Sequence, residues 1–248
     1  MRFEDAPKTI CVWDVESTGT SIENDRIITC YAMIQSIKGE ILEEKHWVID
    51  PGVEVPKGAS DVHGMSTEWV REHGRKDVAE AIFEINWFLE GAISNGTPIV
   101  GYNNSYDLGI LDREMSRHNE RSLNFGRGYF GPEVDGLFFD PIIYDRAMDK
   151  YRKGGRKLMD VARHYGIPID ESRLHQAEYD VIVTAKLAWI LLKKSPHKLD
   201  KMQELQVQWK KEWADGLTSY FAKTNKTEDD GSPIKVDGSF PYKIRENK

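Results

Sequence analysis

A short apolar run that ends in two acids constrains this chain more than any other segment. Residues 9–13 read Thr-Ile-Cys-Val-Trp, which is typical of a β-strand, and Asp14 and Glu16 follow at once. Side chains two residues apart on a strand share one face and lie about 7 Å apart. Carboxylates ~4 Å apart in a partly shielded site repel by about 4 kcal/mol, so such a pair needs a cation or a proton. The pair therefore indicates either a metal-binding strand end or an acidic end that is merely solvated.

The composition predicts one principal domain. The chain has 248 residues, of which 40% are hydrophobic, enough for one sizeable core. Its net charge of -7 argues against a protein that coats nucleic acid through a broad basic surface, but it allows an enzyme that grips a few nucleotides. The two cysteines, Cys11 and Cys30, lie in apolar runs, which suits buried thiols in a reducing compartment.

No apolar run has the length that crosses a membrane, and the first ten residues do not have the pattern of a signal peptide. The sequence therefore predicts a soluble, cytoplasmic protein without a membrane partner.

The order of the expected elements indicates an α/β fold. Residues 26–36 and 41–49 are β-rich and flank a short turn, which predicts a hairpin after the first strand. Apolar spacing predicts a helix at 77–94, and the strand-like run 98–102 follows it, so this strand is expected to be parallel to the first. Further expectations are loops at 50–59 and 119–135, a helix through 108–115, a strand at 137–140, and helices at 141–152, 158–165 and 178–194.

The chain changes character after residue 195. Residues 199–221 predict a charged helix, and the segment from Thr224 onward is polar. The helix carries apolar and aromatic side chains on roughly one stripe, namely Met202, Leu205, Trp209, Trp213, Leu217 and Phe221. We expect this stripe to pack on the main domain; the alternative is a docking surface for a partner.

Three more potential metal ligands stand near the ends of expected helices: Asp107, His175 and Asp180. At 3.6 residues per turn, residues five apart on one helix are about 140° away from a common face. If His175 and Asp180 serve one site, His175 must therefore lie in the loop before the helix. Each residue is a weak signal alone, because acids at helix starts often only complement the helix dipole.

Taken in order, these residues resemble the DEDDh-type 3′-to-5′ exonucleases, the family of the proofreading epsilon subunit of bacterial replicative polymerases. The first motif is matched by Asp-Val-Glu-Ser-Thr-Gly at 14–19, the second by Asn103 with Asp107, and the third by His175 with Asp180. Intervening segments are similar as well, at 24–28, 62–66 and 156–168. Because the resemblance covers about residues 8–194, we expect an exonuclease domain at 1–195 and a C-terminal helix with a polar tail, packed on it, at 196–248.

The resemblance implies a ribonuclease H-like fold, with a central mixed sheet of five strands, the first three antiparallel and the others parallel, flanked by helices. It also implies that Asp14, Glu16, Asp107 and Asp180 hold two divalent ions and that His175 takes the proton from the attacking water. Hard oxygen ligands without thiolates favour Mg²⁺ or Mn²⁺. By the same resemblance, the residues expected to hold the terminal nucleotide are Thr18, Gly19, His63, Met65, Asn103 and Tyr106.

We therefore expect a metal-dependent exonuclease that releases mononucleotides from the 3′ end of single-stranded DNA, with a role in proofreading or repair and a polymerase or other replication protein as partner. An exoribonuclease of the same fold is the first alternative, since few contacts read the 2′-hydroxyl. A weakly catalytic scaffold that binds nucleic-acid ends is the second, although all five motif residues are present. A phosphatase with an aspartyl nucleophile would need an acid-base Asp where Glu16 stands.

Overall fold

The fold is built on one five-stranded sheet with the strand order β3-β2-β1-β4-β5. The computed structural model describes residues 7–118, 137–173, 176–228 and 230–243. The strands are β1 (Thr9–Ser17), β2 (Ile27–Ser36), β3 (Ile41–Val48), β4 (Ile99–Val100) and β5 (Phe138–Phe139). The first three pair antiparallel, whereas β4 and β5 are parallel to β1. The predicted mixed α/β sheet is thus confirmed.

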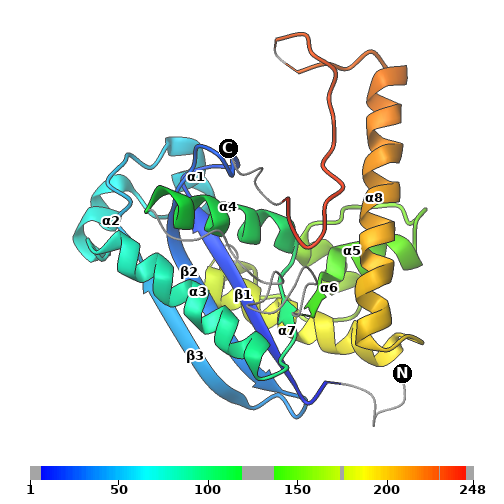
Figure 1. The fold of residues 1–248 in the computed structure, drawn as a ribbon, viewed down its shortest axis with the longest axis horizontal. Helices are drawn as coiled ribbons and strands as arrows, with labels where there is room; N and C mark the ends of the chain where they lie inside the picture. The colour runs from blue at the N-terminus through cyan, green and yellow to red at the C-terminus, as the bar shows by residue number, and fades with distance from the viewer. Residues whose placement is uncertain (1–6, 119–136, 174–175, 229, 244–248) are drawn as a thin grey trace.

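Helices cover both faces of this sheet (Figure 1). They are α1 (Lys57–His63), α2 (Thr67–His73), α3 (Val78–Ser94), α4 (Asn104–Arg117), α5 (Pro141–Met148), α6 (Leu158–His164), α7 (Ala177–Lys194) and α8 (Leu199–Lys223). Helix α7 packs on β1 and β2 from one side, and α3 and α4 cover the other. The helices predicted from apolar spacing at 77–94, 158–165, 178–194 and 199–221 agree with α3, α6, α7 and α8 to within two residues.

Strand β1 is the centre of the core because its side chains alternate between two apolar clusters. Ile10 and Val12 belong to the cluster on the α7 side, whereas Cys11 and Trp13 belong to the cluster under α3 and α4. All four side chains are almost completely buried. The same alternation carries the even-numbered acids at the end of the strand to the α7 face.

Two predicted boundaries were wrong. Helix α1 begins inside the expected loop 50–59, at Lys57. Its sequence carries Gly58 and buries no residue, so it lacks the apolar face by which such a helix is found. Helix α5 ends at Met148 rather than near residue 152, because Asp149 leaves the helical conformation with ψ 64°. The expected loop at 119–135 lies outside the described residues.

Helix α8 is anchored on the sheet through β5. Gln206 is fully buried, its Oε1 accepts from the N–H of Asp140 at 2.7 Å, and its Nε2 donates to the carbonyl of Phe138 at 2.9 Å. Gln203 accepts from the N–H of Phe138 at 2.6 Å. Side chains of α8 therefore bind the outer edge of the sheet as a further strand would. The predicted division of the chain into two parts at residue 195 stays a prediction.

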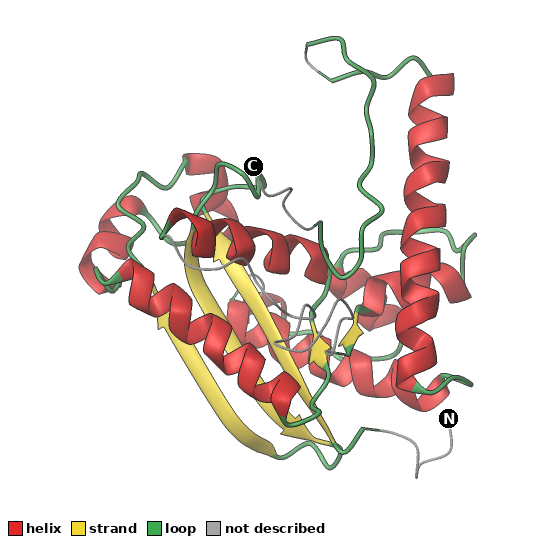
Figure 2. Ribbon diagram, viewed as in Figure 1, coloured by secondary structure: helices red, strands yellow, loops and turns green. Residues whose placement is uncertain are grey.

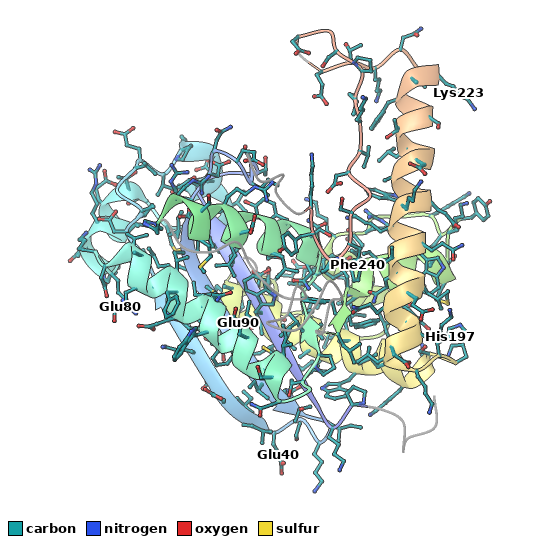
Figure 3. The ribbon with its side chains drawn as sticks, viewed as in Figure 1. Glu40, Glu80, Glu90, His197, Lys223 and Phe240 are labelled. Atoms are coloured by element: carbon teal, nitrogen blue, oxygen red, sulfur yellow. The ribbon has the colours of Figure 1, made fainter. Side chains whose placement is uncertain are left out.

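After α8 the chain returns along the helix to α4. His197 and Lys223, labelled in Figure 3, mark the two ends of α8, and Phe240 lies on the returning segment. Figure 2 shows this segment as loop. It is held by a bond from the Val236 N–H to Thr218 Oγ1 at 3.0 Å and by burial of Tyr242 against the α3–α4 cluster. Among the described helices, none is long and apolar enough to cross a membrane.

Candidate active site

Three carboxylates converge on the α7 side of β1. One oxygen each of Asp14, Glu16 and Asp180 lies within 4.8 Å of the other two. Asp180 lies in the first turn of α7, where it meets the strand end that carries the other two acids. Oxygens that bind one Mg²⁺ lie at most about 4.2 Å apart, since each bond is ~2.1 Å long. The cluster is therefore close to the size that one such ion requires.

Asp107 approaches β1 from the first turn of α4. Its side chain is only 3% exposed, and its carboxylate accepts a hydrogen bond from the backbone N–H of Val15. Further back on β1, the N–H of Cys11 bonds the carbonyl of Pro98 in the neighbouring segment. Because β4 ends at Val100, it offers no backbone carbonyl opposite the N–H of Val15, and the Asp107 carboxylate accepts this hydrogen bond instead. The short β4 thus brings the fourth predicted acid to the site.

Burial and mutual repulsion raise the pKa values of these acids. The pKa of Asp14 lies well above its usual value, first through burial and then through the charges of Asp107, Glu16 and Asp180. Burial, with the charge of Asp180, raises the pKa of Glu16 to about 8. No cation of the described ranges contributes to either shift. A divalent cation would relieve this repulsion, so the donor set fits the ions that the sequence predicts.

Asp140 supports the site although the sequence reasoning gave it no role. It is fully buried, and its carboxylate accepts from the N–H groups of Asn103, Asn104 and Ile142, each at 3.1 Å. Burial raises its pKa to about 6, and after burial its charge contributes most to the raised pKa of Asp107. Asp140 therefore fixes the start of α4. The Asp-Pro pair at the start of α5 was the available signal, because it marks a helix cap.

Tyr106 ties α4 to the turn that follows β1. Its hydroxyl donates to the carbonyl of Gly19 at 2.6 Å and lies 2.7 Å from Ser17 Oγ. A Cβ at position 19 would lie 2.6 Å from the carboxylate of Asp25, so the turn requires glycine there. The predicted contacts of Tyr106 and Gly19 with a nucleotide stay predictions.

The hydroxyl of Thr18 is used inside the same turn. Oγ1 donates to Asp25 Oδ1 and accepts from the N–H of Arg26, both at 2.9 Å, and the residue is 4% exposed. The side chain thus stabilises the turn, and any contact of Thr18 with a nucleotide would come from elsewhere in the residue.

Three other predicted substrate contacts lie near the ends of helices. His63 ends α1, and its Nδ1 accepts from the N–H of Met65 at 3.2 Å. Met65 packs on the small cluster around Ile28, and α1 and α2 lie at the end of the molecule toward which β1 points (Figure 1). Asn103 is exposed, with a left-handed φ of 67°, directly before α4. These three assignments stay predictions, and His175 lies outside the described residues.

A family model described as exonuclease, RNase_T, matches residues 11–188, well over half of the chain. The chain belongs to this exonuclease family. The predicted family is thus confirmed as that of the DEDD-type 3′-to-5′ exonucleases in the ribonuclease H-like superfamily.

Two groups of known proteins are similar to this member of the family. The PolC-type DNA polymerase III of Streptococcus thermophilus is 27% identical over 203 residues, which are 81% of this chain and 12% of the polymerase. The PolC-type polymerase of Pediococcus pentosaceus is 26% identical over 182 residues, 73% of this chain and 11% of the polymerase. The chain thus spans about an eighth of the length of these relatives.

Solved structures of exonuclease I share the fold. One matches with a TM-score of 0.65 at 20% identity, covering 79% of this chain and 43% of exonuclease I. The E. coli enzyme in complex with a dT13 oligonucleotide matches with a TM-score of 0.63 at 20% identity, covering 77% and 42%. At this identity the likeness concerns the fold, and it agrees with the ribonuclease H-like sheet described above.

Proposed function

We propose that this chain is a metal-dependent exonuclease that releases mononucleotides from the 3′ end of single-stranded DNA. The observation that carries the proposal is the cluster of Asp14, Glu16 and Asp180 oxygens within 4.8 Å of one another, with Asp107 bonded to the same strand. Family membership supports hydrolysis of a phosphodiester as the reaction of this cluster.

The four acids are the proposed ligands of two divalent ions, Mg²⁺ or Mn²⁺. When bound, the ions would supply positive charge for the attacking water and for the departing 3′ oxygen. The side chains meet this demand with hard oxygen donors, and their partial burial reduces screening by bulk water. The hydrogen bond from Val15 holds Asp107 in place, while α7 carries Asp180 to the strand end.

His175 is the proposed general base. Its imidazole would take a proton from the attacking water as the water oxygen bonds to phosphorus. The bond from phosphorus to the 3′ oxygen would break, and the departing 3′ oxygen would take a proton from solvent water. An unperturbed imidazole has a pKa of about 6.5, which suits proton transfer near neutral pH. Its place five residues before Asp180 in the sequence supports this role, because α7 begins between them, at Ala177.

DNA is the proposed substrate because the PolC-type relatives are DNA polymerases and a structure of exonuclease I holds a dT13 oligonucleotide. The same relatives support a role in replication, with a polymerase as the proposed partner. The free, buried thiols of Cys11 and Cys30 support a reducing compartment such as the cytoplasm.

Digestion of an end-labelled single strand tests the proposal. With Mg²⁺ or Mn²⁺, we expect a ladder of products shortened from the 3′ end, and Asp14→Asn should lower the rate by at least about 10²-fold. The matched control is Asp215→Asn on α8, which should digest like the wild type because Asp215 is exposed and only pairs with Lys211. A missing ladder, or one unchanged in Asp14→Asn, would refute the exonuclease; faster digestion of a matched RNA would refute the preference for DNA.

A further inference from the structure

A second concave site lies beside α8, apart from the acidic cluster. A cavity of about 510 Å³ opens between α5, the turn after it and the second half of α8. This volume is within the range of pockets that hold small ligands or single groups of larger ones, about 300–1,000 Å³. Its lining combines cations and aromatic rings, with Arg146, Lys150, Tyr151, Trp209, Lys210, Trp213 and Tyr220 among its residues.

Two cations of this pocket share one indole ring. The guanidinium carbon of Arg146 lies 4.2 Å from the ring centroid of Trp213, and Lys210 Nζ lies 5.4 Å from it. Lys210 is only 7% exposed. Throughout the described ranges, neither cation forms an ion pair with a carboxylate, and the one acid of the lining, Glu212, accepts from Gln208. The buried Asp140 acts on both cations only from beyond ion-pair distance, so an anionic ligand between Arg146 and Lys210 would supply a close counter-charge.

Aromatic rings complete the pocket at its rim. Tyr220 is 53% exposed and Tyr151 is 87% exposed, so both rings are accessible to a flat partner, and Lys150 Nζ lies 5.8 Å from the Tyr151 ring centroid. Rings that stack on bases, interleaved with cations that bind phosphates, are the means by which proteins hold single-stranded nucleic acid. With a net charge of -7 the protein as a whole repels a polyanion, so binding of a nucleic acid requires a local concentration of cations such as this one.

The pocket is joined to the structure that supports the acidic cluster. Arg156, in its wall, accepts a hydrogen bond at its carbonyl from the Tyr102 hydroxyl at 2.6 Å, and Tyr102 directly precedes the α4 start. On the other side, the charge of Lys210 acts on the buried Asp140, which caps α4. The same short segments thus shape both sites. Because the two sites share these segments, we favour one extended ligand that occupies both sites over an acidic peptide that binds at the pocket alone.

We propose that the pocket between α5 and α8 binds an internal nucleotide of a single strand whose 3′ end occupies the acidic cluster. The phosphate would lie against Arg146 and Lys210, and the base would stack on the rim. This inference rests on the proposed exonuclease function and adds a strand-holding site that is remote from the chemistry.

Binding of oligonucleotides of two lengths tests the proposal. Fluorescence anisotropy with Ca²⁺ in place of Mg²⁺, so that a cation can occupy the cluster, would compare dT20, which extends well beyond the cluster, with dT4, which covers little more than the cluster. In Arg146→Gln/Lys210→Gln we expect about tenfold weaker binding of dT20, a salt dependence reduced by about 1.4 in slope, and unchanged binding of dT4. The matched control is Arg163→Gln/Lys211→Gln, which removes one exposed cation each from α6 and α8, where both pair with exposed acids.

A second variant guards against a folding defect in the first. Tyr151→Ala removes an almost fully exposed ring and should also weaken binding of dT20 alone, whereas Trp87→Ala, on the exposed face of α3, should not. If both pocket variants bind dT20 like the wild type while the wild type still digests single strands, the pocket proposal is overturned and the exonuclease stands. If the pocket variants lose binding to a labelled acidic peptide but bind dT20 like the wild type, the pocket proposal is overturned in favour of a peptide site. A wild type that neither binds nor digests any strand would refute the underlying function.

Discussion

Glu16 links the chemistry of the site to the stability of the fold. Its pKa is raised from 4.5 to about 8, so between these values the folded chain keeps a proton that the unfolded chain releases. Raising the pH therefore favours unfolding. For the metal-free protein, we expect the free energy of unfolding to fall from about pH 5 to pH 8, and we expect Glu16→Gln to flatten this dependence. At pH 8 the variant should be more stable by about 1–3 kcal/mol, as measured by urea unfolding.

Adding Mn²⁺ to the wild type separates the destabilisation caused by Glu16 from a general effect of pH on the protein. The ion should restore stability at pH 8 more than at pH 5, and it should act less on Glu16→Gln. Glu90→Gln, a partly exposed residue of α3, is the matched control and should follow the wild type. A wild-type stability that is constant over this pH range would contradict the assigned electrostatics.

Asp140 should matter for activity without lying among the ligands. In Asp140→Asn, the amide can accept fewer of the three N–H bonds, and we expect a loss of about 1–3 kcal/mol in stability. The start of α4 would move and carry Asp107 with it, so kcat should fall while the affinity for a strand stays near the wild-type value. Thermal unfolding and single-turnover digestion measure the two effects. The control, Asp200→Asn in the exposed first turn of α8, should change neither.

At the scale of elements, the glutamine contacts of α8 complete the sheet. In Gln206→Ala, the N–H of Asp140 and the carbonyl of Phe138 would lose their partner in a buried environment. Each unsatisfied group costs about 1–3 kcal/mol, so for the two groups we expect a destabilisation of about 2–6 kcal/mol in urea unfolding. Gln208→Ala, two residues further on and on the exposed side of the same helix, should cost less than about 0.5 kcal/mol. Equal effects of the two substitutions would show that α8 only rests on the sheet.

Elements whose pattern is local could be predicted from the sequence. The apolar spacing that specifies α3 and α7 is complete within each segment, and Asp14 and Glu16 share a face because a strand has a period of two. The contact of Asp140 with the start of α4 and the contacts of Gln206 with β5 could not be assigned in this way, because these partners lie 36 and 66 residues away or more. No local rule connects a helix glutamine to a strand edge, so their contribution emerges only from the tertiary structure.

The whole molecule should depend on its C-terminal part for stability. Without 196–248, β5 would lose the side chains that bind its outer edge, and the apolar surface under Met202 would be exposed. We expect chain 1–195 to melt well below the full chain, by more than about 5 °C, and chain 1–223, which keeps α8, to lie closer to it. Circular dichroism against temperature would compare the three. A chain 1–195 as stable as the full chain would show that the boundary at 195 separates independent units.

The way α8 covers β5 also determines how other proteins can attach to the sheet. A partner that adds its own strand needs an edge with free backbone groups, and on the β5 side these groups already bind Gln203 and Gln206. The opposite edge is β3, whose exposed centre carries Glu43, Glu44 and Lys45 in succession. Such charges oppose strand addition. Assemblies that contain this chain are therefore expected to form through side-chain surfaces, and the sheet itself should resist growth into larger aggregates from either side.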